Sequence, residues 1–216
     1  MSLPVSSVVD RPFARARRLI SGAPHPHLEM LGGQARRAEA ASTLLVEFFE
    51  EDSPEASSQR MVELEAEART VNNMLSARLS ADFLTPLDAE DVQAVSTSLT
   101  RVVQSARRAA DAGRELPSRR RLAPVQRELT VMVGKLCDAV DKVAKGQPAF
   151  EQAGDALRHQ RHVRISLRAA TAALVHREGD IFHMVASRQL HAALEEMLHR
   201  LRKSVTCLQW LILKNG

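Results

Sequence analysis

FLTPLDAEDV, residues 83–92, decides the fold, because it ends one helix and begins the next. Thr85 precedes a proline, and a proline ring disfavours the helical conformation in the residue before it, so the first helix must end here. Asp88 then offers a carboxylate to the exposed amides of a new first turn, with Asp91 three positions further on. Both carboxylates suit the positive end of a helix. The sequence therefore predicts a short connection between two helices.

Composition indicates an all-α protein. The 216 residues include no tyrosine, one tryptophan and 3% aromatic residues, and Ala, Leu, Arg and Glu dominate, which is typical of a helical bundle and not of a β-sandwich. A chain of this length can bury a core as one domain or as two halves that share an interface. Cys137 and Cys207 are far apart and flanked by apolar residues, which favours buried thiols over a disulfide framework or a zinc ribbon.

Apolar residues recur with helical spacing in six segments that follow a proline-rich, basic start. We expect residues 1–26 to form a flexible basic tail. The predicted helices span residues 27–51, 55–81, 89–112, 117–145, 149–186 and 189–213. Gly113 is the expected left-handed cap at the end of the third helix, and Ser187 is the candidate cap at the start of the sixth. The fifth helix contains Gly154 and Gly179, either of which could produce a kink or a break.

Short connections make consecutive helices antiparallel. Three helices precede residue 114 and three follow residue 117, which indicates a repeated three-helix unit. We therefore expect six long antiparallel helices arranged as two tandem three-helix bundles, residues 27–114 and 115–216, within one compact domain.

The stretch at 83–92 resembles the phosphate-transport-regulator branch of the PhoU-like family, the accessory proteins of Pit-type phosphate permeases, whose string reads roughly FITPFDREDI. The matching residues are Phe83, Thr85, Pro86, Asp88, Glu90 and Asp91. The resemblance covers roughly residues 27–216 and includes the ending at 211–215. It implies two three-helix bundles side by side. It also implies a non-catalytic regulatory or adaptor protein of phosphate or other anion transport, which binds a membrane transporter or sensor protein at the inner membrane surface.

The resemblance further implies a metal-binding patch in each unit, built from acidic pairs spaced i, i+4 on its second and third helices, because such pairs stand on one helix face. In the first unit Glu63 and Glu67 fit this pattern on the second helix. Thr100 and Gln104 stand where the third helix should carry two aspartates. Half of the first patch is therefore absent.

The second unit keeps four side chains that can ligate a metal, as two carboxylates and two imidazoles: His176, Asp180, Glu195 and His199. Imidazole shifts the preference from calcium and magnesium to a divalent transition metal such as zinc, iron, nickel or manganese. The alternative is that the patch has decayed and these are ordinary surface residues. Three functions therefore remain as alternatives to the adaptor: a metal-dependent enzyme, a metal-storage bundle and a metal-free helical interaction scaffold.

Arginines recur on one helix face at Arg158, Arg161, Arg164 and Arg168. This stripe would suit an anionic lipid surface, phosphate or an acidic partner, with an ordinary solvated face as the alternative. The cluster at 119–121 could serve the same purpose. Nucleic acid is disfavoured, because no aromatic residues are interleaved with these cations.

Neither a nucleophile elbow nor a phosphate loop can be read in the chain, so we expect no enzyme. No segment reaches the roughly 20 apolar residues needed to span a bilayer. We expect a cytoplasmic protein, with peripheral contact to a membrane and homo-oligomerisation left open.

Overall fold

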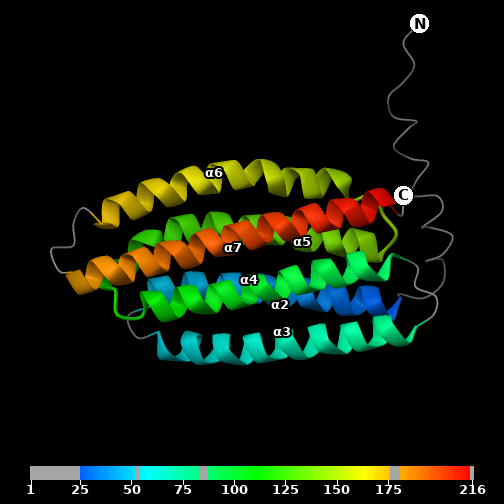
Figure 1. Cartoon of the computed structure of the whole chain (residues 1–216). Coiled ribbons are helices and arrows are strands. Elements are labelled where there is room, and N and C mark those ends of the chain that lie inside the picture. Colours follow the sequence, from blue (N-terminus) through cyan, green and yellow to red (C-terminus); the bar gives the residue numbers. More distant parts are fainter. Residues whose placement is uncertain (1–24, 52–53, 83–86, 176–180, 215–216) are drawn as a thin grey trace, which may run out of the picture.

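The computed structural model describes residues 25–51, 54–82, 87–175 and 181–214, and this part of the chain is entirely helical (Figure 1). The elements, labelled as in Figure 1, are α2 (Pro26–Glu50), α3 (Glu55–Ala81), α4 (Ala89–Gly113), the 3-10 helix η1 (Pro117–Leu122), α5 (Ala123–Ala144), α6 (Phe150–Val175) and α7 (Ile181–Lys214). Within the described ranges there are six long helices and no strand. The all-α prediction is confirmed.

Asp88 caps α4 as its position in the sequence predicts. Its Oδ1 accepts hydrogen bonds from the amides of Glu90, at 3.0 Å, and Asp91, at 3.4 Å. The preceding helix, α3, ends at Ala81, while residues 83–86 of the quoted stretch lie outside the described residues. The cap also meets the far end of the chain, because Nζ of Lys214 lies 2.8 Å from Oδ2 of Asp91. The negative start of α4 thus faces the cation that ends α7.

The predicted fourth helix, 117–145, is wrong at its beginning. The chain forms the 3-10 helix η1 over Pro117–Leu122, and the α-helix begins only at Ala123, with Pro124 in its first turn. Proline lacks an amide hydrogen and is tolerated in the first turn of an α-helix but not in its interior. Pro124 therefore sets the start of α5. The helix ends as predicted near Gly146, whose φ of 64° is the left-handed conformation that favours glycine.

The boundary between the fifth and sixth helices also differs from the prediction. Helix α6 ends at Val175 and α7 begins at Ile181, so Ser187 is a buried residue inside α7 and not its cap. Gly154 lies within α6, which continues past it, and Gly179 falls in residues 176–180, outside the described part. A serine can cap a helix only where the helix starts, and here packing continues the helix through it.

Gly113 does not adopt the left-handed conformation that the sequence suggests. Among the described glycines, only Gly146 has a positive φ. Gly113 instead sits where helices approach closely. A Cβ atom at this position would lie 3.3 Å from the ring of Phe48 and 3.6 Å from the side chain of Leu190. The end of α4 is therefore packed against α2 and α7.

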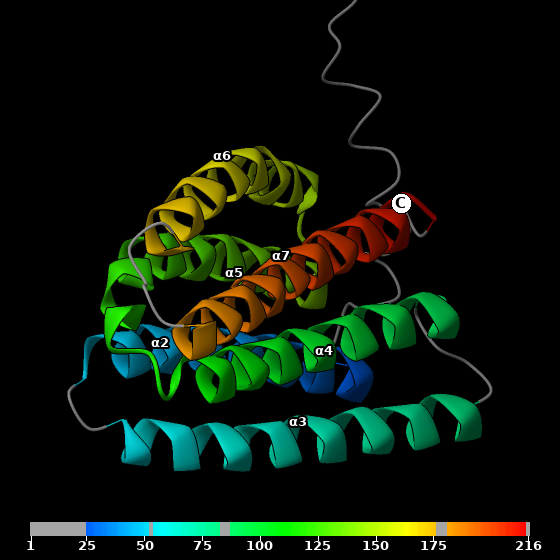
Figure 2. The ribbon, with the colours of Figure 1, turned by 60° about the vertical axis from the view of Figure 1, so that its left-hand side comes forward.

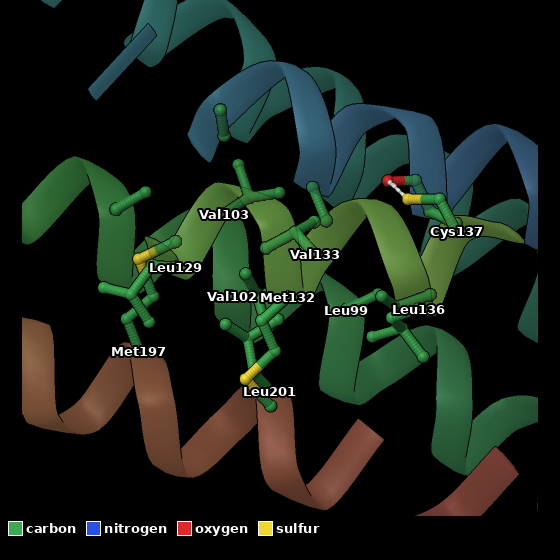
Figure 3. Close-up of a cluster of buried hydrophobic side chains, with 14 of the residues drawn as sticks. Leu99, Val102, Val103, Leu129, Met132, Val133, Leu136, Cys137, Met197 and Leu201 are labelled. Atoms are coloured by element: carbon green, nitrogen blue, oxygen red, sulfur yellow. Dashed lines mark hydrogen bonds between the residues drawn. The ribbon is translucent and has the colours of Figure 1, made fainter. Parts of the chain in front are cut away.

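Helix α4 packs along α7, and α2 packs along α5, to form the centre of the bundle. The α4–α7 pair is antiparallel, because Lys214 at the end of α7 contacts Asp91 at the start of α4. The α2–α5 pair is antiparallel too, because the earlier Thr130 of α5 meets Ser42 while the later Cys137 meets Ala35 of α2. Helices α3 and α6 lie on opposite sides of this centre, as Figures 1 and 2 show. The buried apolar residues form one continuous core. In Figure 3, Leu99 of α4, Met132 of α5 and Leu201 of α7 gather in it.

Candidate functional site

In the first unit, arginines face the predicted metal-binding carboxylates. Nη1 of Arg60 lies 2.8 Å from Oε2 of Glu63 and 3.3 Å from Oε1 of Glu67, and Nε of Arg37 on α2 lies 3.4 Å from the other oxygen of Glu67. The hydrogen bond to Glu63 is the chief reason that the pKa of Arg60 is raised. Two guanidinium groups thus supply the positive charge that a metal ion would bring. A metal site at Glu63 and Glu67 therefore stays a prediction, which would require a cation to displace these two arginines.

Thr100, which stands where the resemblance expects a carboxylate, belongs to a buried hydrogen-bonded connection between three helices. Gln34 of α2, with 0% of its surface exposed, donates from Nε2 to Oγ1 of Thr100 at 2.5 Å and to the carbonyl of Ala68 on α3 at 3.0 Å. Oγ1 of Thr100 donates in turn to the carbonyl of Ser96 at 3.0 Å. This position joins α2, α3 and α4 and offers nothing to solvent.

In the second unit the structure describes two of the four predicted metal ligands, since His176 and Asp180 lie outside the described residues. His199 is exposed on α7. Glu195 is half-exposed, and its Oε1 lies 3.6 Å from Nε of Arg168 on α6. Among the residues that the structure covers, no three His, Cys, Asp or Glu side chains come together as a metal-holding group. The four-residue metal site stays a prediction.

Sequence reasoning missed His191, which lies beside Glu195. Its Nδ1 is 2.8 Å from Oγ1 of Thr171 on α6, and its Nε2 is 3.8 Å from Oε1 of Glu195. The i, i+4 spacing of His191 and Glu195 is visible in the sequence, whereas the contact with Thr171 depends on how α6 packs against α7. Together these side chains form a polar seam between the two helices.

The predicted arginine stripe on α6 is exposed along its whole length. Arg158 pairs with Asp155 one turn earlier, and Arg168 pairs with Glu195. Arg161 and Arg164 have no ion pair in the described part of the chain. Two of the four guanidinium groups of the stripe are therefore exposed without a counter-charge among the described residues.

The basic cluster at 119–121 consists of one buried arginine and two exposed ones. The side chain of Arg119 is buried, with 8% of the residue exposed, and it donates hydrogen bonds to carbonyls of α2 and of the turn before η1. Arg120 and Arg121 are exposed. Arg119 is a structural residue, because its partners lie within the bundle.

A groove of about 530 Å³ lies between α4 and α7. Its size is within the usual range of ligand sites. Its lining residues are Ser105, Arg108, Asp111, Ala112, Gln189, Ala192, Ala193 and Glu196. The two carboxylates are already paired, Asp111 with Arg107 at 3.1 Å and Glu196 with Arg200 at 2.5 Å. The groove is therefore a candidate binding surface whose two carboxylates already have arginine partners. The sequence did not predict it, because it forms only where α4 packs against α7 in the tertiary structure.

The thiols of the chain are poorly placed for chemistry. Cys137 is buried and donates from Sγ to the carbonyl of Ala35 at 3.1 Å, and burial raises its pKa (Figure 3). Cys207 is half-buried, and burial also raises its pKa. Both cysteines are free. A raised pKa keeps a thiol in its unreactive protonated form.

None of the described helices combines the length and the apolar character that crossing a bilayer would require. Polar residues interrupt even α7, which has 34 residues.

Comparison with known proteins identifies the fold. No family model matches the sequence, and no curated protein is similar to it at a significant level. Two solved structures from Shewanella oneidensis MR-1 do match. A PhoU-like protein has a TM-score of 0.72 at 12% identity, covering 87% of this chain and 99% of its own. A protein described as a PhoU-like phosphate regulatory protein has a TM-score of 0.63, with the same identity and coverage. The chain therefore has the PhoU-like fold.

Proposed function

We propose that this protein is a non-catalytic regulatory or adaptor protein of inorganic-anion transport, with phosphate as the anion. The observation that carries the proposal is the fold itself, which matches nearly the full length of a protein described as a PhoU-like phosphate regulatory protein. Fold alone does not specify function. The local residues favour the non-catalytic part of the proposal, because both carboxylates of the α4–α7 groove are held in ion pairs, which disfavours their use in proton transfer.

The partner in this proposal is a membrane transporter or sensor protein at the inner membrane surface. A rigid bundle can transmit the state of such a partner by docking and release, without chemistry of its own. The long antiparallel pair α4 and α7 supplies the rigid body, because its contacts are the most extensive between any two described helices. The two halves, 27–114 and 115–216, are proposed as repeats, which the pairing of α4 with α7 and of α2 with α5 supports.

A metal-free form of this function is favoured for the first unit. Arg60 and Arg37 face Glu63 and Glu67, so these carboxylates are neutralised within the fold. In the second unit a divalent transition metal held by His176, Asp180, Glu195 and His199 remains a proposal. Its contribution would be to stiffen α6 against α7.

Deletion of the gene in the source organism tests this function. We expect altered uptake of radiolabelled phosphate and altered expression of phosphate-responsive genes, both restored by the wild-type chain. Cross-linking from photoreactive residues placed at exposed positions should then capture a membrane transporter or a sensor protein. Unchanged uptake and unchanged expression in the deletion strain, at both low and high phosphate, would overturn the proposal.

A further inference from the structure

Helices α6 and α7 present two exposed stripes that combine cations with large apolar side chains. On α6 the exposed stripe follows helical spacing and comprises Arg158, Arg161, Arg164, Ile165 and Arg168. On α7 a stripe with the same spacing runs from one end of the helix to the other and includes Ile181, Val185, Arg188, Arg202, Lys203, Trp210 and Leu213. Positions three and four apart lie on one face of a helix, so each stripe is a single face.

The two stripes are neighbours. Arg168 belongs to the α6 stripe, and its Nε lies 3.6 Å from Oε1 of Glu195, which stands on the α7 stripe between Arg188 and Arg202. Both ribbon views show α6 and α7 side by side (Figures 1 and 2). We call the combined face the α6–α7 surface.

The charge of this surface is positive. The described parts of α6 and α7 contain four acidic residues, of which Asp155, Glu195 and Glu196 are each paired with an arginine, while Glu151 stands exposed in the first turn of α6. Five exposed cations have no ion pair in the part of the chain that the structure covers: Arg161, Arg164, Arg188, Arg202 and Lys203. Cations left without intramolecular partners are available to anions outside the protein.

Exposed apolar side chains concentrate on the same two helices. The described residues include ten large apolar side chains that are exposed, and seven of them belong to α6 or α7. Ile181 is 75% exposed and Trp210 is 57% exposed. Five of the seven, Ile165, Ile181, Val185, Trp210 and Leu213, stand in the two stripes. Scattered exposed apolar residues need no explanation, but several on one face beside unpaired cations indicate an interaction site.

We propose that the α6–α7 surface docks on an anionic lipid bilayer, with its cations on the lipid phosphates and its apolar side chains at the boundary with the acyl chains. Basic residues beside Trp, Phe and Ile are the combination that holds helices in the membrane interface. The surface is about 50 Å long at 1.5 Å per residue of α7. A continuous plane can cover such a length, whereas a protein partner of standard size covers less. This proposal goes beyond the regulatory function and does not depend on it.

Trp210 makes the test direct, because it is the one tryptophan in a chain without tyrosine. Full-length protein is mixed with vesicles of phosphatidylcholine, with and without phosphatidylglycerol. We expect co-sedimentation only with the anionic vesicles, together with a blue shift of the Trp210 emission and its quenching by lipids brominated on the acyl chains. Raised salt should weaken binding, since exposed charges are screened.

Matched variants assign the binding to this surface. Arg161→Ser with Arg164→Ser removes two cations from α6, and Arg69→Ser with Arg78→Ser removes two exposed cations from α3 on the opposite side of the bundle. We expect the first pair to lower the partition coefficient at least about tenfold, at roughly 1 kcal/mol per cation, and the second to leave it unchanged. Circular dichroism establishes that both variants are folded.

Four outcomes would overturn the proposal: no binding to anionic vesicles, an unshifted Trp210 emission, equal losses in both variants, or equal binding to neutral vesicles. Binding to poly-glutamate or to single-stranded DNA without binding to lipid would likewise overturn it and would assign the surface to an acidic protein or to nucleic acid.

Discussion

The guanidinium of Arg119 lies over the ring of Phe48, with 5.6 Å between Cζ and the ring centroid. The same group donates to three carbonyls, those of Phe48 at 3.3 Å, Leu116 at 3.2 Å and Glu51 at 2.9 Å. These carbonyls belong to the end of α2 and to the turn that precedes η1. One buried cation therefore joins two segments that are far apart in the sequence, through charge-assisted hydrogen bonds and a cation–π contact.

Arg119→Ala should destabilise the fold by about 2–4 kcal/mol, because three buried carbonyls lose a charged donor. Arg119→Lys should recover only part of this loss, since an ammonium lacks the planar fork that reaches all three acceptors. Arg121→Ala, at an exposed position of the same short helix, should change stability by less than about 0.5 kcal/mol. Urea denaturation followed by circular dichroism measures all three. Equal effects of the two alanine variants would show that Arg119 is not the structural residue.

Thr100→Asp places a carboxylate where the family resemblance expects one, and we expect this substitution to lower the stability of the fold. Position 100 is 6% exposed and bonded to Gln34, so the new charge would be desolvated, at a cost of about 2–4 kcal/mol at neutral pH. Burial would raise the pKa of this aspartate, so the folded state would hold the proton more tightly than the unfolded state, and the cost should shrink as the pH falls.

Gln104→Asp is the control, because Gln104 is only half-buried and the charge there can reach water. Denaturation curves at neutral and at mildly acidic pH separate the two variants. A Thr100→Asp protein that is as stable as the wild type and binds manganese would contradict this account and show that position 100 accepts a metal-binding carboxylate.

His27 should make stability fall in mild acid. The residue is 2% exposed, Nε2 lies 2.9 Å from Oδ2 of Asp82, and Nδ1 lies 3.1 Å from Nδ1 of His25. Burial first, and then His25, hold the pKa of His27 below its ordinary value of 6.5, although Asp82 acts in the opposite direction. The unfolded state therefore binds the proton at a higher pH than the folded state does.

Neutral His27 makes its full contribution to the free energy of unfolding above pH 6.5. That contribution is lost as the pH falls from 6.5 through the lowered pKa of the folded state. Thermal denaturation at a series of pH values, with His27→Gln beside the wild type, measures this contribution. We expect a shallower pH dependence in the variant. Parallel curves for the two proteins would mean that His27 contributes nothing to acid sensitivity.

The helices could be predicted because their signals are local. Apolar spacing places them, and Asp88 caps α4 with its own side chain. One error at a boundary has a local reason as well: Pro124 fixes the start of α5 and was visible in the sequence. Ser187 was wrongly predicted to cap the last helix, because serine is a favourable cap residue. In the structure the packing of α7 against the core outweighs that preference, and the helix continues through Ser187.

The candidate site was less predictable because its partners come from other helices. Arg60 stands three residues before Glu63 and could have been noticed, but Arg37 reaches Glu67 from α2 only because those helices pack together. Charge alone suggested the α6 stripe. The apolar half of the α6–α7 surface could not be read from the sequence, since a periodic Ile or Trp is usually buried, and only packing shows that Trp210 is not.

Metal content should depend on the second unit and not on the first. Arg60 and Arg37 already neutralise Glu63 and Glu67, so Glu63→Gln with Glu67→Gln should leave the metal content of purified, untagged protein unchanged. The same variant should lose less than about 1 kcal/mol of stability, because these ion pairs are largely solvent-exposed.

His176→Ala with His199→Ala should instead abolish any stoichiometric zinc, iron, nickel or manganese, because a transition-metal site of this composition depends on its imidazoles. Elemental analysis of the wild type and both variants, before and after reconstitution with each metal, makes the comparison. Loss of metal from the glutamine variant would contradict the ion-pair reading of Arg60 and Arg37. Wild-type protein that stays metal-free after reconstitution would remove the second-unit site and its stiffening role, and the regulatory function would then depend on docking surfaces alone.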